Sequence, residues 1–184
     1  MEIGGIFFWQ QRKWSDIVRR INTSSNSNQL PKLEFEDIIS GFGELNKDIS
    51  GKLDNRKGTL FQPQNILFGK LRPYLKNWLY ANFKGIALGD FWVFESRQTI
   101  PIFDYYLMQA DTFQKVANDT SGTKMPRSDW KTVSETLFEI PFDKTEQIKV
   151  GHFFQLLDLH VTLLQQKLDK LTKLKKAYLQ QMFV

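Results

Sequence analysis

Apolar residues recur at alternating steps of four and three along the C-terminal part of the chain. This spacing is the heptad repeat of a helix that packs against another helix in a coiled coil. Asp143 and Glu146 resemble a capping box, and Pro141 marks the end of a preceding strand, so the helix is expected to begin near these residues. The seam comprises Val150, Phe154, Leu157, Val161, Leu164, Leu168, Leu171, Lys175, Tyr178 and Met182.

The length of this helix indicates that it needs a partner. A helix from Glu146 to Met182 would extend roughly 55 Å, which is longer than a domain of this size requires. Its first turns, around Phe153 and Phe154, are expected to pack on the chain's own domain. The sequence holds no second helix of this kind, so the outer part is expected to pair with another copy or another protein. The residues expected at that contact are Leu157, Val161, Leu164, Leu168, Leu171, Tyr178 and Met182.

The preceding residues show the short apolar runs that are typical of strands joined by turns. Runs at residues 66–68 and 91–94 are rich in branched and aromatic side chains and are the clearest strand candidates. Residues 103–116 have helical spacing, and the polar run 23–29 is expected to be a surface loop. The predicted fold class is therefore α/β, in the mixed α+β sense, with a domain at residues 1–143 and a helical coiled-coil region at 144–184.

The composition indicates a globular chain from a reducing compartment. Of the 184 residues 41% are hydrophobic, which is enough for a core, and there is no cysteine. The apolar stretch Ile3–Trp9 is too short to span a membrane, and its basic residues follow it, unlike those of a signal peptide. We therefore expect a cytoplasmic protein with no membrane contact.

The charge is positive overall, but it is unevenly distributed. The formal net charge is +5. Residues 1–143 carry 18 Lys and Arg against 17 Asp and Glu, whereas residues 144–184 carry 7 against 3. Bulk charge therefore does not identify the first region as a nucleic-acid binder, and any footprint there must come from cations gathered on one face.

Catalytic and metal-binding patterns are weak. His152 and His160 lie eight residues apart, which does not match the four-residue spacing of helical metal ligands. Glu34, Glu36 and Asp37 could form an acid–base or metal group, as in a small nuclease, but an exposed strand edge explains them better. No phosphate-binding or dinucleotide-binding glycine pattern is present. We therefore predict no catalytic residue, no metal site and no cofactor of the chain's own.

Two segments combine cations with aromatic or small polar residues. In residues 68–74, a glycine and a proline bracket a turn that would present two cations together; in residues 120–127, small residues would allow close approach to a phosphate. Composition alone is equally compatible with ordinary exposed loops. The candidate DNA-binding residues are Lys70, Arg72, Tyr74, Ser121, Gly122, Thr123, Lys124 and Arg127.

These segments, together with others in the same order, resemble the specificity subunits of type I restriction-modification systems. The further matching segments are residues 9–17, Trp130, Ile140-Pro141 with Glu146-Gln147, and residues 165–168 and 179–183. The resemblance covers nearly the whole chain. It implies a target-recognition domain that binds one part of a split DNA site, followed by a helix that spaces this domain from its counterpart.

The chain differs from this family in length, because its members usually carry two recognition domains and two such helices. The chain is similar to the C-terminal half, so a homodimer could rebuild the full arrangement and bind a palindromic, interrupted site. The resemblance implies double-stranded DNA, a modification subunit and a restriction subunit as partners, and it leaves adenine methylation and S-adenosylmethionine to the modification subunit. The alternative is a coiled-coil interaction module, or a decoy, that binds the modification subunit without recognising DNA.

Overall fold

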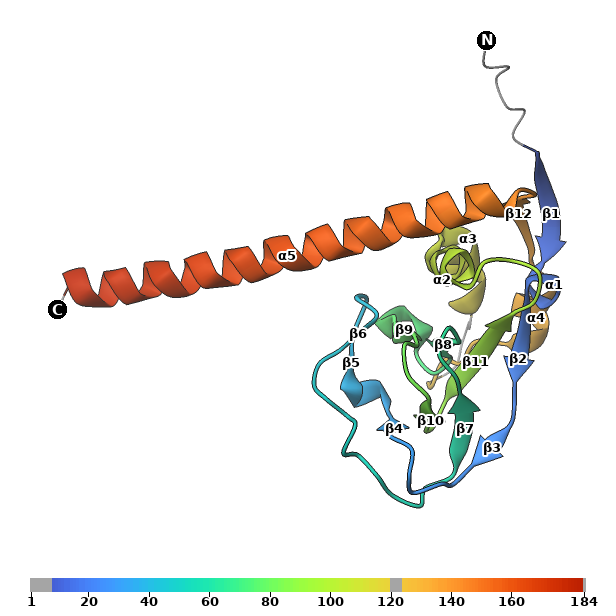
Figure 1. Ribbon diagram of the computed structural model, residues 1–184, viewed down its shortest axis with the longest axis horizontal. Helices are drawn as coiled ribbons and strands as arrows, with labels where there is room; N and C mark the ends of the chain where they lie inside the picture. Colours follow the sequence, from blue (N-terminus) through green and yellow to red (C-terminus); the bar gives the residue numbers. More distant parts are fainter. Residues whose placement is uncertain (1–7, 120–123, 184) are drawn as a thin grey trace, which may run out of the picture. The chain divides into compact units, whose positions relative to one another are not determined.

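The computed structural model describes residues 8–119 and 124–183, and the chain divides into two compact units, Met1–Gly151 and His152–Val184. The first unit contains small sheets and short helices, and the second is the outer part of α5 (Lys144–Met182), the long red-to-orange helix of Figure 1. The predicted combination of a mixed α+β domain and one long C-terminal helix is confirmed.

A four-stranded antiparallel sheet forms the centre of the domain. Its order is β2 (Val18–Ile21), β11 (Phe91–Ser96), β8 (Ile66–Gly69), β9 (Trp78–Tyr80). β8 and β11 contain the two apolar runs that the sequence indicated as strands. Every residue of β8 is buried, which explains its continuous apolar character.

Shorter strands surround this sheet. A second four-stranded sheet has the order β3 (Ser24–Ser25), β7 (Gly58–Phe61), β10 (Gly85–Ala87), β4 (Lys32–Leu33). Two ribbons consist of β1 (Trp9–Lys13) with β12 (Leu137–Pro141) and of β5 (Ile38–Ile39) with β6 (Glu44–Leu45). The polar run at residues 23–29 is thus not entirely a loop, because Ser24 and Ser25 pair with β7.

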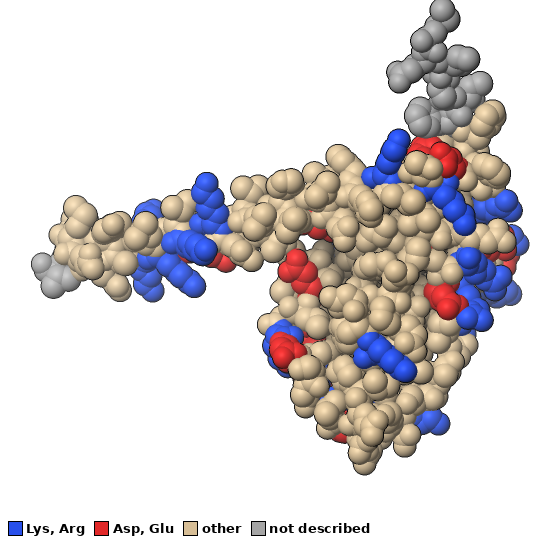
Figure 2. Space-filling model, in the orientation of Figure 1, with Lys and Arg blue, Asp and Glu red and all other residues tan. Residues whose placement is uncertain are grey.

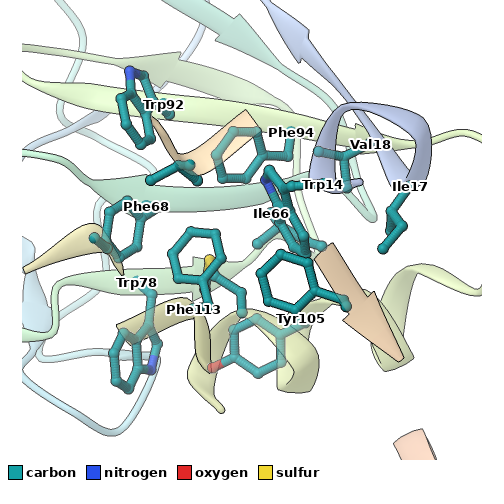
Figure 3. Packing of buried hydrophobic residues seen from close by; sticks show 14 of the residues in the cluster. Trp14, Ile17, Val18, Ile66, Phe68, Trp78, Trp92, Phe94, Tyr105 and Phe113 are labelled. Carbon is teal, nitrogen blue, oxygen red and sulfur yellow. The ribbon is translucent and has the colours of Figure 1, made fainter. Parts of the chain in front are cut away.

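An aromatic core joins the central sheet to the helices α1 (Trp14–Ile17), α2 (Pro101–Gln109), α3 (Asp111–Ala117) and α4 (Trp130–Glu135). Trp14 is fully buried, and its ring lies 4.9 Å from that of Phe113 and 5.6 Å from that of Phe94, between centroids (Figure 3). Such edge-on aromatic contacts add to the stabilisation from burial alone. The core therefore fixes β11, and with it the loops at both ends of this strand.

The predicted helix over residues 103–116 is two helices. Ala110 has an extended conformation (φ −64°, ψ 152°) between α2 and α3. The Gln114 side-chain amide donates to the Met108 carbonyl at 2.7 Å, which replaces a hydrogen bond of the interrupted helix. Met108 and Phe113 are both fully buried, so core packing overrides the high helix propensity of alanine at the break.

Asp104 on α2 is a fully buried carboxyl group inside this core. Thr99 donates a hydrogen bond to it at 2.6 Å. Burial raises the pKa of Asp104 to about 7, and the hydrogen bond from Thr99 only partly opposes this effect. The folded state therefore binds a proton that the unfolded chain releases near pH 4, so the stability of the fold decreases as the pH rises from about 4 to 7.

Replacing this carboxyl group by an amide tests the pH dependence. We expect Asp104→Asn to raise the free energy of unfolding at pH 8 by roughly 1 to 3 kcal/mol and to flatten its dependence on pH, because no charge has to be buried. Urea denaturation at pH 5, 6, 7 and 8 measures both effects, with Asp111→Asn at an exposed position as the control. Identical pH profiles of wild type and Asp104→Asn would contradict the assignment.

The start of α5 belongs to the domain. Asp143 Oδ1 accepts a hydrogen bond from the Thr145 backbone at 2.8 Å and so caps the first turn. Gln147 is 2% exposed, and Val150 packs against the aromatic core. The residues that bury the helix start are thus one turn earlier than the expected Phe153 and Phe154, whose side chains are 57% and 42% exposed.

Gly151 allows this helix to approach α2 closely. A β-carbon at this position would lie 2.7 Å from Cγ2 of Ile102 and 3.1 Å from the Phe103 nitrogen. We expect Gly151→Val to lower the free energy of unfolding by about 1 to 3 kcal/mol through this overlap, although glycine itself disfavours a helix. Thermal denaturation compared with Lys149→Val, an exposed position on the same turn, measures the effect. Equal melting temperatures of the two variants would refute the close packing.

Candidate nucleic-acid interface and helical seam

Two basic segments that are far apart in the sequence meet at one end of the central sheet. After β8 the chain continues through Leu71, which forms an antiparallel bridge with Arg127. The Arg72 backbone N–H donates to the Pro126 carbonyl at 2.7 Å, and the Ser128 N–H donates to the Lys70 carbonyl at 2.9 Å. The structure therefore places the segment around Lys70 directly beside the segment around Arg127.

The turn that follows β8 has an unusual backbone. Arg72 and Lys76 both adopt left-handed conformations, with φ of 49° and 53°, on either side of the short helix η2 (Pro73–Leu75). Side chains other than glycine rarely occupy this region, and such residues cluster at binding and catalytic sites. Both cations are exposed at the surface. The backbone thus presents two positively charged side chains from one tight turn.

A third segment supports this turn from the β5–β6 ribbon. The Gly41 N–H donates to the Lys76 carbonyl at 3.0 Å, and the Ser40 hydroxyl donates to the Leu75 carbonyl. Gly41 has φ of +80°, which glycine adopts without strain. The neighbouring Phe42 side chain is 46% exposed. Three separate segments are therefore hydrogen-bonded into one surface, which we call the three-loop surface: residues 40–43, 70–76 and 124–128.

Asp90 forms the electrostatic centre of the three-loop surface. Its carboxylate accepts a hydrogen bond from Nη2 of Arg127 at 2.9 Å and lies 3.6 Å from Nζ of Lys70. Its carbonyl accepts from the Lys70 backbone N–H at 2.8 Å. One carboxylate thus orients cations from both basic segments while a quarter of its side chain remains exposed.

The chemistry of the three-loop surface suits contact with a polyanion. Guanidinium groups can bind phosphates or form paired hydrogen bonds with guanine, and exposed aromatic rings can pack on bases or sugars. Tyr74 is 57% exposed and Met125 51% exposed, beside the cations. The surface therefore combines positive charge, large exposed side chains and a backbone held by hydrogen bonds.

The sequence-predicted DNA-binding residues have different outcomes. Ser121, Gly122 and Thr123 lie outside the described residues, and Lys124 is exposed. The remaining five lie on the three-loop surface: Lys70, Arg72, Tyr74, Lys124 and Arg127. Whether these residues contact DNA stays a prediction.

The sequence did not predict three other residues at the three-loop surface: Phe42, Lys76 and Asp90. Phe42 and Lys76 belong to loops whose proximity depends on tertiary contacts, and Asp90 looks like an ordinary turn residue. The Gly-Phe-Gly pattern at residues 41–43 was a usable signal for Phe42, because glycines on both sides of an aromatic residue are typical of an exposed turn tip.

The acidic group around Glu34 forms an ion-pair network. Lys52 lies 2.6 Å from Glu34 and 2.8 Å from Asp37, and Arg56 lies 2.7 Å from Glu34. Hydrogen bonds from Arg56 and Lys52 lower the pKa of Glu34. These contacts hold the segment 47–56 against η1 (Phe35–Asp37), which is a structural explanation for the cluster. In the part of the chain that the structure describes, no group of three or more His, Cys, Asp or Glu side chains could hold a metal ion.

The seam of α5 is exposed along the second unit. The seven seam side chains that were expected to contact a partner are between 43% and 75% exposed: Leu157, Val161, Leu164, Leu168, Leu171, Tyr178 and Met182. Exposed apolar rows of this length mark interaction sites in soluble proteins. Within residues 8–119 and 124–183, no helix is long and apolar enough to cross a membrane.

The same helix carries a second apolar row. Leu156, Leu159, Leu163 and Leu174 are each about half exposed. At 3.6 residues per turn, Leu156 lies about 100° around the helix from Leu157, so this row occupies a face next to the seam. A helix with apolar side chains on two faces is suited to contact more than one other helix.

Comparison with known proteins places the fold. No family model and no curated protein matches the sequence. Several solved structures match this structure. The chain has the fold of specificity subunits of type I restriction-modification systems, as the sequence resemblance predicted.

Three of these structures share low sequence identity with the chain. A chain from a structural study of the complex assembly and conformational transition of a type I restriction-modification system matches over 90% of this chain, with 19% identity and a TM-score of 0.67. The HsdS subunit of Thermoanaerobacter tengcongensis matches over 86%, with 18% identity and a TM-score of 0.65. The S subunit of M. genitalium matches over 90%, with 10% identity and a TM-score of 0.58. The match covers 47%, 44% and 43% of those chains, so this chain spans less than half of their length.

Replacing Asp90 is expected to change how the three-loop surface discriminates between ligands. Asp90→Asn removes one negative charge and releases Arg127, so non-specific duplex binding should become about two- to fivefold tighter, while preference for the cognate sequence should decrease. Fluorescence anisotropy with cognate and scrambled duplexes measures both quantities. Glu95→Gln, which removes a carboxylate paired with Arg19 at the other end of β11, is the matched control. Equal effects of the two substitutions would show that only net charge matters.

Proposed function

We propose that this chain is a non-catalytic, sequence-specific DNA-binding subunit of a cytoplasmic type I restriction-modification complex. The observation that carries the proposal is the convergence of the segments around Lys70 and Arg127 on one surface. These two segments are among those that resemble the family's specificity subunits, and the chain has the fold of such subunits. In this function, Arg72, Arg127 and their neighbours recognise one half of a split double-stranded DNA site.

The long helix is proposed to pair two copies of the chain. Support comes from the exposed seam, because an isolated helix with such an apolar face is poorly stable in water without a partner. Two copies would together supply the two recognition domains that the longer specificity subunits carry in one chain. A two-fold symmetric dimer would bind a palindromic, interrupted sequence, since the symmetry of the target follows that of the protein.

The chain is proposed to act as recognition module and scaffold, with catalysis in other subunits. A modification subunit would methylate adenine with S-adenosylmethionine, and a restriction subunit would cleave DNA. The second apolar row of α5 supports contact with helices outside the homodimer. On this assignment residues 1–143 form the target-recognition domain and residues 144–184 the spacer and dimerisation region, although the compact domain includes the helix up to Gly151.

Co-expression with the modification subunit from the same genome tests this function. We expect adenine methylation of plasmid DNA at a palindromic, interrupted motif, mapped by single-molecule sequencing. A methylated motif that is interrupted but asymmetric would argue against the homodimer. Co-purification of the two proteins without methylation at any site would overturn DNA recognition and favour the decoy.

The decoy is the second candidate, and the unpaired helix is the observation that favours it. A decoy would occupy the modification subunit through α5 alone. Its activity would remain intact after replacement of Lys70, Arg72, Lys124 and Arg127, whereas a DNA-recognition subunit would lose its activity. The same four-residue variant in the co-expression experiment therefore distinguishes the two functions.

A further inference from the structure

An open cleft lies at the end of the central sheet opposite to the three-loop surface. β11 begins at Phe91, beside Gly69, and ends at Ser96, beside Val18. This strand of six residues separates Asp90, which precedes it, from Arg97, which follows it, by about 20 Å. The cleft has a volume of about 540 Å³, and Arg97 is part of its lining. It is therefore a separate feature from the surface that is proposed to bind DNA.

Cations dominate the lining of this cleft. Arg12, Arg97 and Lys144 line it, with Asp16 as the single carboxylate among its described lining residues. None of the three cations forms an ion pair with a described residue, and the Arg12 guanidinium donates only to the neighbouring Gln10 amide, at 2.8 Å. On the three-loop surface, by comparison, Asp90 pairs with two of the cations, Lys70 and Arg127. Among the described residues, cations therefore outnumber carboxylates in the cleft, and this positive charge is available to carboxylate or phosphate groups.

Three exposed aromatic rings adjoin the cleft at the end of the β1–β12 ribbon. The exposed fractions of Phe8, Trp9 and Phe142 are 69%, 51% and 70%. The Phe142 N–H donates to the Phe8 carbonyl at 2.9 Å, and Trp9 pairs with Pro141, so the three rings belong to one end of the ribbon. Phe142 also lines the cleft. Aromatic residues and arginine are the types most enriched at protein–protein interfaces.

The backbone around the cleft is held in place by buried hydrogen bonds. Gln147, in the first turns of α5, is 2% exposed; its Oε1 accepts from the Ile100 N–H at 3.0 Å and its Nε2 donates to the Pro141 carbonyl at 2.8 Å. The Arg97 N–H donates to the Ile17 carbonyl at 2.9 Å. A ligand would therefore meet a preformed surface, which lowers the entropy cost of binding.

We propose that this region is a docking surface for a partner protein, through a segment that carries carboxylates beside an apolar side chain. Charge complementarity argues for the carboxylates, and the exposed rings argue for the apolar side chain. Figure 2 shows Lys and Arg side chains gathered along the edge of the domain where β1, β2 and α1 lie. The docking surface comprises Phe8, Trp9, Arg12, Arg97, Phe142 and Lys144.

The inference rests on the proposed function, which names the modification subunit as the protein partner of this chain. Duplex DNA is less suited to this surface, because the proposed DNA surface lies at the other end of β11, about 20 Å away. A complex in which DNA occupies one end of the sheet and a protein subunit the other would keep both contacts free of mutual obstruction.

The test uses the full chain and the purified modification subunit as the probe. Arg12→Glu with Arg97→Glu, and separately Trp9→Ala with Phe142→Ala, are expected to weaken binding of that subunit by at least about tenfold in calorimetric titration. Anisotropy with a cognate duplex, in the absence of the subunit, should change less than about threefold. Lys84→Glu with Lys115→Glu, at exposed unpaired positions elsewhere, is the matched charge control, and thermal denaturation verifies that each variant folds. Arg12→Gln with Arg97→Gln replaces the charge-reversal pair if the latter unfolds.

Each of the other outcomes overturns the inference and indicates a different role for the cleft or for its charges. Unchanged subunit binding with weakened duplex binding would assign the cleft to DNA and leave the proposed function intact. A change only in self-association, measured by analytical ultracentrifugation, would assign it to a second copy. Equal losses in the docking variants and in the Lys84 and Lys115 control would show a general charge effect. Failure of the wild-type chain to bind the modification subunit would refute the partnership in the proposed function and this surface together.

Discussion

Replacing Arg72 and Arg127 together by alanine is expected to weaken binding of a cognate DNA duplex on the order of 100-fold. Each guanidinium can supply a paired hydrogen bond to a base or a charged contact to a phosphate, which typically contributes about 1 to 3 kcal/mol. The two side chains lie on segments joined by the Leu71–Arg127 bridge, so both are placed to reach the same stretch of duplex. Fluorescence anisotropy at a fixed salt concentration measures the loss. The probe is a duplex that contains the motif mapped by methylation.

The salt dependence of the same variants separates the two kinds of contact. If an arginine binds a phosphate, its removal reduces the slope of log affinity against log salt concentration by about 1 and affects all sequences equally. If it binds a base, discrimination at one position of the motif is lost and the slope is nearly unchanged. Lys84→Ala with Lys115→Ala is the control for the loss of two surface cations. An effect of that control as large as that of the arginine pair would exclude a localised site at the three-loop surface.

Local sequence patterns were sufficient to predict the elements that dominate the fold. The heptad spacing from Val150 onwards predicts a long helix, because the apolar residues there repeat with the period of a helix and no contact with the domain competes with this pattern. β8 and β11 were predictable because both are buried apolar runs bounded by turn residues. The prediction failed at Ala110, where nothing in the local sequence opposes a continuous helix and the break comes from the packing of Met108 and Phe113 in the core.

The candidate site was predictable only in its parts. The segments around Lys70 and Arg127 could be identified from their composition and their family resemblance, but no local pattern shows that they form an antiparallel bridge. That contact depends on β11, which places Asp90 between them. The left-handed conformations of Arg72 and Lys76 were equally inaccessible, since sequence gives no reason to expect positive φ at a residue other than glycine, asparagine or aspartate. Tertiary context therefore determines the site, although its cations lie in recognisable segments.

The two proposed surfaces make different demands on the chain. The three-loop surface pairs two of its cations, Lys70 and Arg127, with Asp90, an arrangement that orients both side chains and reduces non-specific attraction to a polyanion. In the docking surface, Arg12, Arg97 and Lys144 form no ion pair with a described residue and lie next to exposed aromatic rings, an arrangement suited to a partner that carries both carboxylates and apolar side chains. A net charge of only +1 over residues 1–143 is compatible with DNA binding because five cations gather on the three-loop surface.

Introducing charge into the seam of α5 is expected to convert a dimer into a monomer. Leu164→Glu with Leu168→Glu places two like charges against their counterparts in the partner helix and removes two apolar contacts, so self-association should weaken by more than about 100-fold. Analytical ultracentrifugation measures this loss, and Gln155→Glu with Gln180→Glu, which adds the same two charges outside the seam, is the control. Circular dichroism of the variants should show less helix, because an unpaired helix of this length is marginal in water.

Methylation by the double glutamate variant tests whether the function requires a dimer. A monomer would present one recognition domain, so methylation at the palindromic motif should disappear in co-expression, whereas the domain's own affinity for a single half-site duplex should change little. If the double glutamate variant remains dimeric, the seam is not the contact between copies. If it becomes monomeric and methylation persists, one recognition domain is sufficient for the complex and the symmetry argument fails. In the proposed function, the seam thus links the apolar spacing of the helix to the symmetry of the DNA sequence that a dimer would recognise.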